Sequence, residues 1–222
     1  MKKTVSQKTY DEVAPYYRQV SNEKESYLKS IDNIVDSYAS GKKSLIDLGS
    51  GDGIRALRIC ERAEINNFLL VDNSSEMIKF SKLNSPSASS QMVNQSIVEF
   101  RPESKYDIAT CLWNVLGHIE STKEIEATII NIEKNIIKDD GIFILDINNR
   151  YNSSAYGLKQ VIKNIFLDIL FPLNEKYVEF YKNIFGQKIK MRVHFFNPWE
   201  IDRLISKTSL YLRKKIYLNY ET

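Results

Sequence analysis

The sequence Leu45-Ile46-Asp47-Leu48-Gly49-Ser50-Gly51-Asp52-Gly53 decides the fold of this chain. Residues 44–48 form a short apolar run, typical of a buried parallel strand, and a helical pattern begins near Ile54. Three glycines between a strand and a helix let the backbone turn tightly and approach a ligand without a Cβ in the way. The helix directs its free N–H groups toward the same space. The segment therefore predicts a ligand-binding loop in a doubly wound α/β sheet.

Two acidic residues beside this loop indicate its ligand. The glycines follow the spacing GxGxG, whereas the dinucleotide fingerprint is GxGxxG. Asp47, at the end of the strand, would repel a pyrophosphate but suits a ligand with an ammonium or sulfonium group. Asp72 ends the next apolar run, about 20 residues further on, where a carboxylate can accept both hydroxyls of a ribose. S-adenosylmethionine carries all three groups and no phosphate, and is therefore the cofactor that we expect.

Strand and helix patterns alternate after the loop. Strands are expected at residues 44–48, 68–71, 91–94, 106–112 and 142–147. Helices are expected at about 54–63 and 75–83, followed by a longer one that carries Ile125, Ile129, Ile132 and Ile136 and ends at Gly141. Such alternation indicates a mostly parallel Rossmann-like sheet with helices on both faces. A plain strand–helix turn with a solvated acid would explain either Gly49–Gly53 or Asp72 alone, but not both in this order.

With these features the chain resembles the class I S-adenosylmethionine-dependent methyltransferases over nearly its whole length. Residues 47–53 look like the first motif of that family, and Asp72 looks like its ribose-binding acid. The resemblance implies that the chain is an enzyme that uses S-adenosylmethionine and releases S-adenosylhomocysteine. The cofactor-binding residues that we expect are Tyr17, Asp47, Gly49, Ser50, Gly51, Gly53, Asp72, Asn73, Met77, Gln95, Ser96, Leu112 and Trp113.

Some of these positions have individual roles. Met77 could cover one face of the adenine, and the resemblance places Gln95 or Ser96 near the adenine, although the acid usual in the family is absent there. It also implies that the backbone of Leu112 and Trp113 lies beside the methionine part of the cofactor. Tyr17, in an N-terminal helix, would close over the cofactor.

The methyl acceptor is expected at the ends of the fourth and fifth strands. Methyl transfer requires an aligned nucleophile, exclusion of water and, for a protonated nucleophile, a base. His118 is the candidate base, since histidine titrates near neutral pH; capping a helix or bonding a backbone carbonyl is the alternative. Asn149 and Arg150 could bind an anionic acceptor, or form an ordinary turn. Residues 111–118 and 145–150 resemble small-molecule N- and O-methyltransferases, glycine N-methyltransferase among them, which implies a small metabolite or biosynthetic intermediate.

We expect a single domain over residues 1–222. It comprises an N-terminal helical cover (1–43), a cofactor-binding core (44–150), an inserted lid (151–190) and a C-terminal helix and strand (191–222). Residues 158–171 could lie on a membrane surface by an apolar face, although a lid over an apolar pocket is preferred. Asn197, Pro198 and Glu200 predict a helix start with a capping box.

The last strand of the sheet has three candidate solutions. Members of the family usually place a final strand antiparallel beside the fifth. Residues 211–218 are predicted as a strand, residues 188–196 could fill the position, and a second subunit in a homodimer could cover the edge.

Composition narrows the function further. The 222 residues carry a formal charge of +3 without a basic stripe, so no nucleic-acid partner is expected. Cys60 and Cys111 lie in apolar stretches, which favours reduced core residues, a cytoplasmic protein and no metal site. No stretch has the length of a membrane span. An RNA or protein methyltransferase, or an S-adenosylmethionine-binding partner protein without turnover, remains an alternative.

Overall fold

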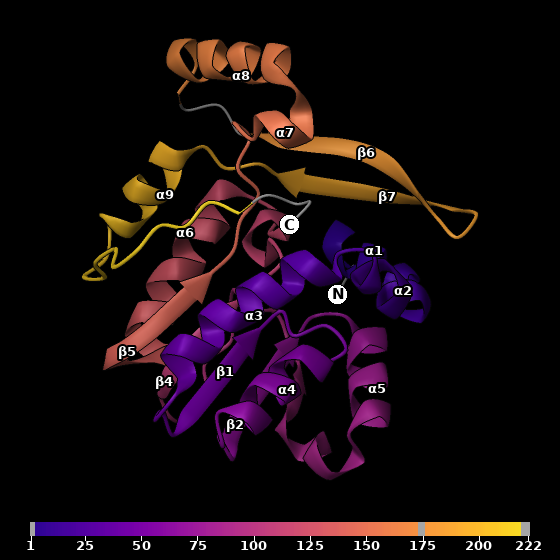
Figure 1. Cartoon of the computed structure of the whole chain (residues 1–222), viewed down its shortest axis with the longest axis vertical. Coiled ribbons are helices and arrows are strands. Elements are labelled where there is room, and N and C mark those ends of the chain that lie inside the picture. Colours follow the sequence, from indigo (N-terminus) through magenta and orange to yellow (C-terminus); the bar gives the residue numbers. More distant parts are fainter. Residues whose placement is uncertain (1–2, 173–175, 219–222) are drawn as a thin grey trace.

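The fold is built on one parallel sheet, as a computed structural model of the chain shows (Figure 1). The structure describes residues 3–172 and 176–218. Its strands are β1 (Ser44–Leu48), β2 (Asn67–Asp72), β3 (Met92–Asn94), β4 (Tyr106–Cys111) and β5 (Ile137–Leu145). They pair in the order β3-β2-β1-β4-β5, every pair parallel. The predicted doubly wound α/β sheet is therefore confirmed.

Helices cover both faces of this sheet. The helices are α3 (Glu25–Ala39), α4 (Ile54–Arg62), α5 (Ser75–Asn84), α6 (Thr122–Asn131) and α9 (Pro198–Ile205). Successive strand residues point to opposite faces, so Leu45 packs with α3 and α4 while Ile46 packs with α6 and α9. Because both faces are buried, the central strands need apolar residues at nearly every position, which explains why β1 reads as a continuous apolar run.

The junction between α6 and β5 differs from the expectation. The helix was expected to continue to Gly141, but α6 ends at Asn131, a π-helical turn covers Ile132–Ile136, and β5 begins at Ile137. The β4–β5 register then shifts at a bulge, and Gly141 lies inside it. A Cβ on Gly141 would lie 2.8 Å from the carbonyl oxygen of Lys138, so glycine is needed here for a close backbone approach and not for a helix end.

The N-terminal cover begins with two short helices that precede α3. α1 (Val5–Val13) is followed by a 3₁₀ turn at Ala14–Tyr16 and by α2 (Tyr17–Asn22). Val13, Ala14 and Tyr17 pack in one cluster across this break, which contains Pro15, a residue without the N–H needed inside an α-helix. Tyr17 thus begins a helix of its own.

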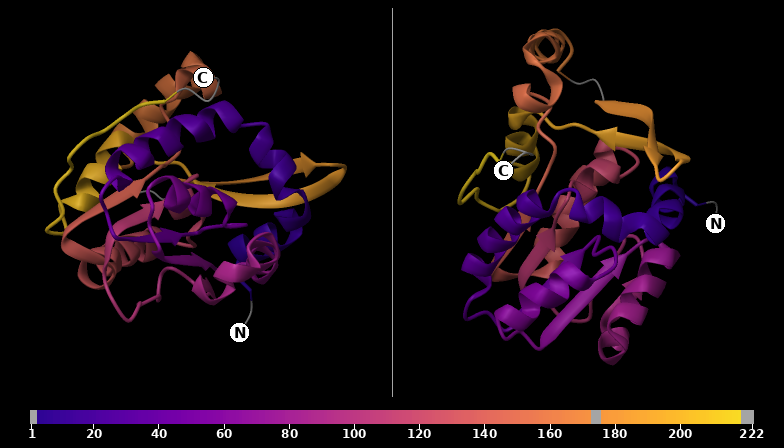
Figure 2. Two further views of the ribbon diagram at one scale, coloured as in Figure 1. Left: turned by 60° about the horizontal axis from the view of Figure 1, so that its bottom comes forward. Right: turned by 45° about the vertical axis from the view of Figure 1, so that its right-hand side comes forward.

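Residues 151–190 form two separate structures. α7 (Ser153–Tyr156) and α8 (Leu158–Leu170) lie at one end of the molecule, whereas β6 (Tyr177–Ile184) and β7 (Gln187–His194) form an antiparallel hairpin that reaches over α1 (Figures 1 and 2). Ile184 and Ile189 of the hairpin pack with Val13 and Met77. The hairpin is therefore tied to the N-terminal cover, while α8 is not.

The C-terminal predictions are corrected in two places. Asn197 caps α9, its Oδ1 accepting from the N–H of Glu200 at 2.8 Å, as predicted. The carboxylate of Glu200 does not complete a capping box, because it bonds the buried Nε2 of His194 at 2.8 Å. His194 is fully buried, so this contact belongs to the interior of the protein. Residues 211–218, predicted as a strand, contain no regular structure.

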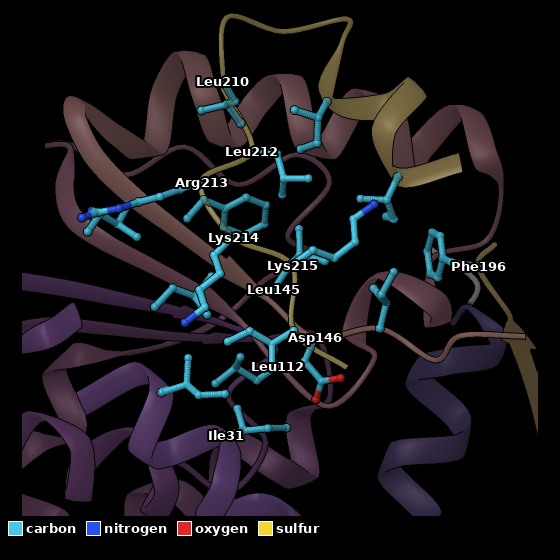
Figure 3. Close-up of a pocket in the computed structure, with 18 of the residues that line it drawn as sticks. Ile31, Leu112, Leu145, Asp146, Phe196, Leu210, Leu212, Arg213, Lys214 and Lys215 are labelled. Atoms are coloured by element: carbon cyan, nitrogen blue, oxygen red, sulfur yellow. The ribbon is translucent and has the colours of Figure 1, made fainter. Parts of the chain in front are cut away.

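The outer edge of β5 carries no further strand in the described part of the chain. Residues 188–194 pair with β6 and not with β5, so this proposed solution is also wrong. A cavity of about 1510 Å³ separates β5 and α3 from the C-terminal segment. Figure 3 shows Leu210 and Leu212 on one side of it and Leu145, Leu112 and Ile31 on the other. A strand requires a partner backbone within hydrogen-bonding distance. Residues 211–218 lie across the cavity from β5 and do not pair with it.

Candidate functional site

The glycine loop lies at the carboxyl ends of the central strands, between β1 and α4. Gly49, Gly51 and Gly53 all adopt left-handed backbone conformations, with φ of 81°, 57° and 75°. A Cβ on Gly49 would lie 2.5 Å from Val115, and one on Gly51 would lie 2.9 Å from the hydroxyl of Tyr17. The loop therefore requires glycine both for its backbone angles and for the close packing around it.

Asp72 holds the loop by its carboxylate. Its Oδ2 accepts a hydrogen bond from the N–H of Gly51 at 2.8 Å, and its Oδ1 accepts one from Ser74 at 2.8 Å. Burial raises the pKa of Asp72 to about 6. Each carboxylate oxygen can accept two hydrogen bonds, so the side chain retains capacity for the hydroxyls of a ribose.

Asp47 adds a second buried acid beside the loop. Its Oδ1 accepts from the hydroxyl of Thr110 at 2.7 Å, and burial raises its pKa. Its charge also contributes to the raised pKa of Asp72. Two desolvated carboxylates at one loop favour a cationic ligand and oppose a phosphate.

The cover closes over the loop through α2. The ring of Tyr17 lies against Gly51, and its centroid is 5.5 Å from that of Trp113. Arg18, the next residue, forms an ion pair with the buried Asp52 of the loop at 2.6 Å. Nothing local in the sequence indicates that α2 meets the loop, so Arg18 is not among the residues predicted for the site.

The end of β4 is held in a strained conformation. Trp113 and Asn114 both have positive φ values, 61° and 58°, which are rare outside glycine. Asp146, just after β5, fixes this turn: its Oδ2 accepts from the N–H of Trp113 at 2.9 Å, and its Oδ1 from the hydroxyl of Tyr27 at 2.9 Å. Strained backbone of this kind clusters at functional sites. Asp146 was not among the predicted site residues. Its position directly after an apolar run, like that of Asp72, is the sequence feature that could have identified it.

His118 meets the N-terminal cover at the same edge. Its Nε2 lies 3.0 Å from the hydroxyl of Tyr10, and the ring also bonds the backbone of Arg192. Burial lowers its pKa to about 4, so the imidazole is neutral at pH 7. A bond to the backbone was the alternative to catalysis, and it is present; the role of base stays a prediction.

The other expected cofactor residues surround Asp72 and the loop. The N–H of Gln95 donates to the carbonyl oxygen of Asp72 at 3.0 Å, while the Gln95 side chain is exposed. Ser96 accepts from Val98 at 3.3 Å. Ser50 is buried, Leu112 is buried at the end of β4, and Asn73 accepts from Gln7 through its carbonyl oxygen. Met77 is fully buried against α1, so its side chain is part of the core.

Asn149 and Arg150 face a different region. Asn149 pairs with Phe196 through an isolated bridge. Arg150 lies 3.4 Å from Asp168 and 3.3 Å from the side-chain oxygen of Asn164, both on α8. The charge of Arg150 is thus already compensated inside the protein, and its role in binding a substrate stays a prediction.

The large cavity is separate from the glycine loop. Leu112 and Asp146 line the cavity, but no residue of 49–53 does. In the described residues no group of three or more His, Cys, Asp or Glu could hold a metal, and no helix is long and apolar enough to cross a membrane. Cys60 and Cys111 are buried and unbridged, as expected.

Comparisons with known proteins support the fold. No family model matches the chain. An uncharacterized protein of Methanocaldococcus jannaschii is 25% identical over 199 residues, which are 89% of this chain and 73% of that protein. An S-adenosylmethionine-dependent methyltransferase from Clostridium acetobutylicum has a similar structure, with a TM-score of 0.61 and 15% identity over 89% of this chain and 86% of the other.

Two further solved structures are of proteins described as sugar methyltransferases. The sugar N-methyltransferase KedS8 from Streptoalloteichus matches with a TM-score of 0.60 and 12% identity over 86% of this chain and 81% of its own. CalS10, an amino pentose methyltransferase from Micromonospora echinaspora solved with bound S-adenosylmethionine, matches with a TM-score of 0.55 and 10% identity over 86% and 87% of the two chains.

Proposed function

We propose that this chain, whose fold is that of the class I S-adenosylmethionine-dependent methyltransferases, transfers a methyl group from S-adenosylmethionine to oxygen or nitrogen of a small molecule. One observation carries the proposal: two buried acids, Asp47 and Asp72, flank a loop of three left-handed glycines at the carboxyl ends of β1 and β2. That position is where open α/β sheets bind ligands. The acids match the positive groups and the ribose of this cofactor.

The chain's own residues would hold the cofactor in a defined way. Asp72 would accept the ribose hydroxyls with the lone pairs that the backbone leaves unused. The loop amides and the N-terminus of α4 would approach the methionine part without a Cβ in the way. Tyr17, held near by the Arg18–Asp52 ion pair, would cover the site and exclude water. Bound cofactor supplies a methyl group on a sulfonium.

The acceptor would lie near Tyr10 and His118. In the transfer, the acceptor's oxygen or nitrogen forms a bond to the methyl carbon, the carbon–sulfur bond breaks, and its electron pair stays on the sulfur. A proton of the acceptor must leave. Because His118 is neutral at pH 7 and its Nε2 meets the hydroxyl of Tyr10, the pair can receive that proton through the tyrosine hydroxyl. The sugar-modifying activity of KedS8 and CalS10 supports a small, hydroxyl- or amine-bearing acceptor.

Calorimetry with three ligands tests the proposal. S-adenosylmethionine and S-adenosylhomocysteine should bind with dissociation constants of order micromolar, about −8 kcal/mol, and NAD should not bind. Binding of NAD alone would show that the loop belongs to a dinucleotide site. With binding established, a screen of amino sugars and small amines or alcohols would follow methyl transfer by release of S-adenosylhomocysteine. Tyr10→Phe should then lower turnover and leave cofactor affinity unchanged.

A further inference from the structure

Helix α8 buries its polar face and exposes its apolar face, the reverse of the other long helices. Its buried residues are Val161, Asn164 and Asp168, two of which are polar. Its apolar residues point to solvent: Leu158, Ile162 and Phe166 are 66%, 59% and 61% exposed. In a water-soluble domain the apolar face of a helix normally packs inward, as it does in α3.

A specific polar network fixes this orientation. Asp168 accepts from the hydroxyl of Tyr151 at 2.7 Å and from the side-chain amide of Asn197 at 3.1 Å, and Arg150 lies 3.4 Å away. Asn164 donates to the carbonyl oxygen of Arg150 at 2.9 Å. Rotating α8 to bury its apolar face would break these buried contacts. The outward apolar face is therefore a built feature of the fold.

The exposed face forms one continuous stripe. Leu158, Ile162, Phe166, Ile169 and Leu170 are all exposed, and their spacing of three or four residues places them on one side of the helix. Phe171 extends the stripe beyond the end of the helix. Exposed apolar surface of this kind marks an interaction site.

The charge beside the stripe is positive. Lys159 and Lys163 lie along its edge and are exposed. The sole acid between residues 153 and 172 is Asp168, which is buried and occupied by the network below. The outer face of α8 thus combines apolar side chains with two cations and no anion.

The position of α8 suits a flat surface. Figure 1 shows α8 at one end of the longest axis of the molecule, lying across that axis, and the turned view of Figure 2 places it at the same end. Its outer face can therefore meet a plane without a clash from the other described residues of the chain. A 13-residue helix is about 20 Å long, so one face of it offers less than the roughly 800 Å² per partner of a stable protein interface.

We propose that the outer face of α8 binds an anionic lipid surface, with the helix parallel to the membrane plane. The stripe from Leu158 to Leu170 enters the boundary between headgroups and acyl chains, while Lys159 and Lys163 contact lipid phosphates. The rest of the chain stays in water, with the glycine loop away from the lipid. This interaction does not depend on the proposed methyl transfer.

Vesicle sedimentation tests this inference. The full chain is mixed with vesicles of phosphatidylcholine alone or of an equal mixture with phosphatidylglycerol, without cofactor. Binding should be stronger to the mixed vesicles by about tenfold and should weaken with salt. Ile162→Asn with Phe166→Asn should lower binding to the mixed vesicles by about tenfold or more. Lys159→Gln with Lys163→Gln should remove the preference for phosphatidylglycerol.

A matched control distinguishes binding through this face from non-specific adsorption of exposed apolar side chains. Leu83→Asn with Tyr211→Asn also removes two exposed apolar side chains, 74% and 82% exposed, from elsewhere on the surface and should leave binding unchanged. Circular dichroism establishes that each variant is folded. No binding by the unaltered chain, or equal losses in the two double variants, would overturn the proposal. So would a dimer that dissociates in the α8 variant without any vesicle binding, because the occupant would then be a second copy.

Discussion

The glycine loop and the base of α8 each bury a carboxylate, yet the two carboxylates have different partners. Asp72 is bonded by backbone N–H groups alone and keeps acceptor capacity. Asp168 is surrounded by Arg150, Tyr151 and Asn197, which compensate its charge. A buried acid without a cation is costly to the empty protein and suits a ligand, whereas an acid enclosed by a cation and donors serves the structure.

The largest expected effect concerns the structural acid. Asp168→Ala would leave the partly buried Arg150 without its ionic partner, and removing one partner of a buried pair typically costs about 3–5 kcal/mol. We expect the free energy of unfolding, measured in urea, to fall by about this amount while S-adenosylmethionine affinity per folded molecule is unchanged. Asp168→Asn, which keeps an acceptor for Tyr151, should lose less. An unchanged urea midpoint for the alanine variant would mean that α8 is held by other contacts.

The second prediction compares a left-handed glycine from each region. Gly51→Val places a branched side chain where Tyr17 lies and where φ is 57°, and should weaken S-adenosylmethionine binding about a hundredfold or more, a loss of about 2.7 kcal/mol. Gly157→Val, between α7 and α8, also replaces a glycine of positive φ, 78° with a ψ of 151°, a conformation that is essentially restricted to glycine, but it has nothing within 4 Å of the new Cβ. It should lower stability and spare the affinity. Equal effects on binding would show that the loop has no special place in the site.

The sequence identified the first region better than the second. Strands β1 to β4, the glycine loop and both of its acids follow from local patterns, because a strand buried on both faces and a tight strand–helix turn each restrict neighbouring residues. The outward direction of the apolar face of α8 does not follow from local patterns, since such a face packs inward in most soluble proteins. It depends on Arg150, Tyr151 and Asn197, which lie 14 to 29 residues away from their partners on the helix. The prediction of a strand at residues 211–218 was wrong for a related reason. The composition of this segment suits a strand, but no partner backbone lies beside it.

A third prediction isolates the cost of the ligand-binding acid. Asp72 has a raised pKa of about 6, so its contribution to stability is present at low pH and is lost as the pH rises through 6. His118 acts in the opposite sense, because its pKa is lowered to about 4 and its contribution is lost as the pH falls below 6.5. The two offset each other between pH 4 and 6.5. In His118→Gln the unfolding free energy should therefore fall between pH 4 and 7, measured by urea titration of the empty protein. Asp47, Asp52 and Asp146 contribute in the same sense, because burial raises their pKa values too. Adding Asp72→Asn should remove about 2 kcal/mol of the fall. An equal fall with and without Asp72→Asn would show that Asp72 is not desolvated.

The smallest expected effect is the pH dependence of binding itself. If the ionised Asp72 accepts the ribose hydroxyls, the protein must lose its proton before it binds, and a pKa of about 6 makes the affinity about tenfold weaker at pH 5 than at pH 7. The α-amino group of the cofactor stays protonated over this range, and His118 titrates below it, so neither should contribute. Calorimetry at pH 6 in buffers of different ionisation enthalpy should show proton release. Asp72→Asn should bind weakly and without this pH dependence, whereas a variant that kept it would assign the titration to another group, Asp47 first, whose pKa burial also raises.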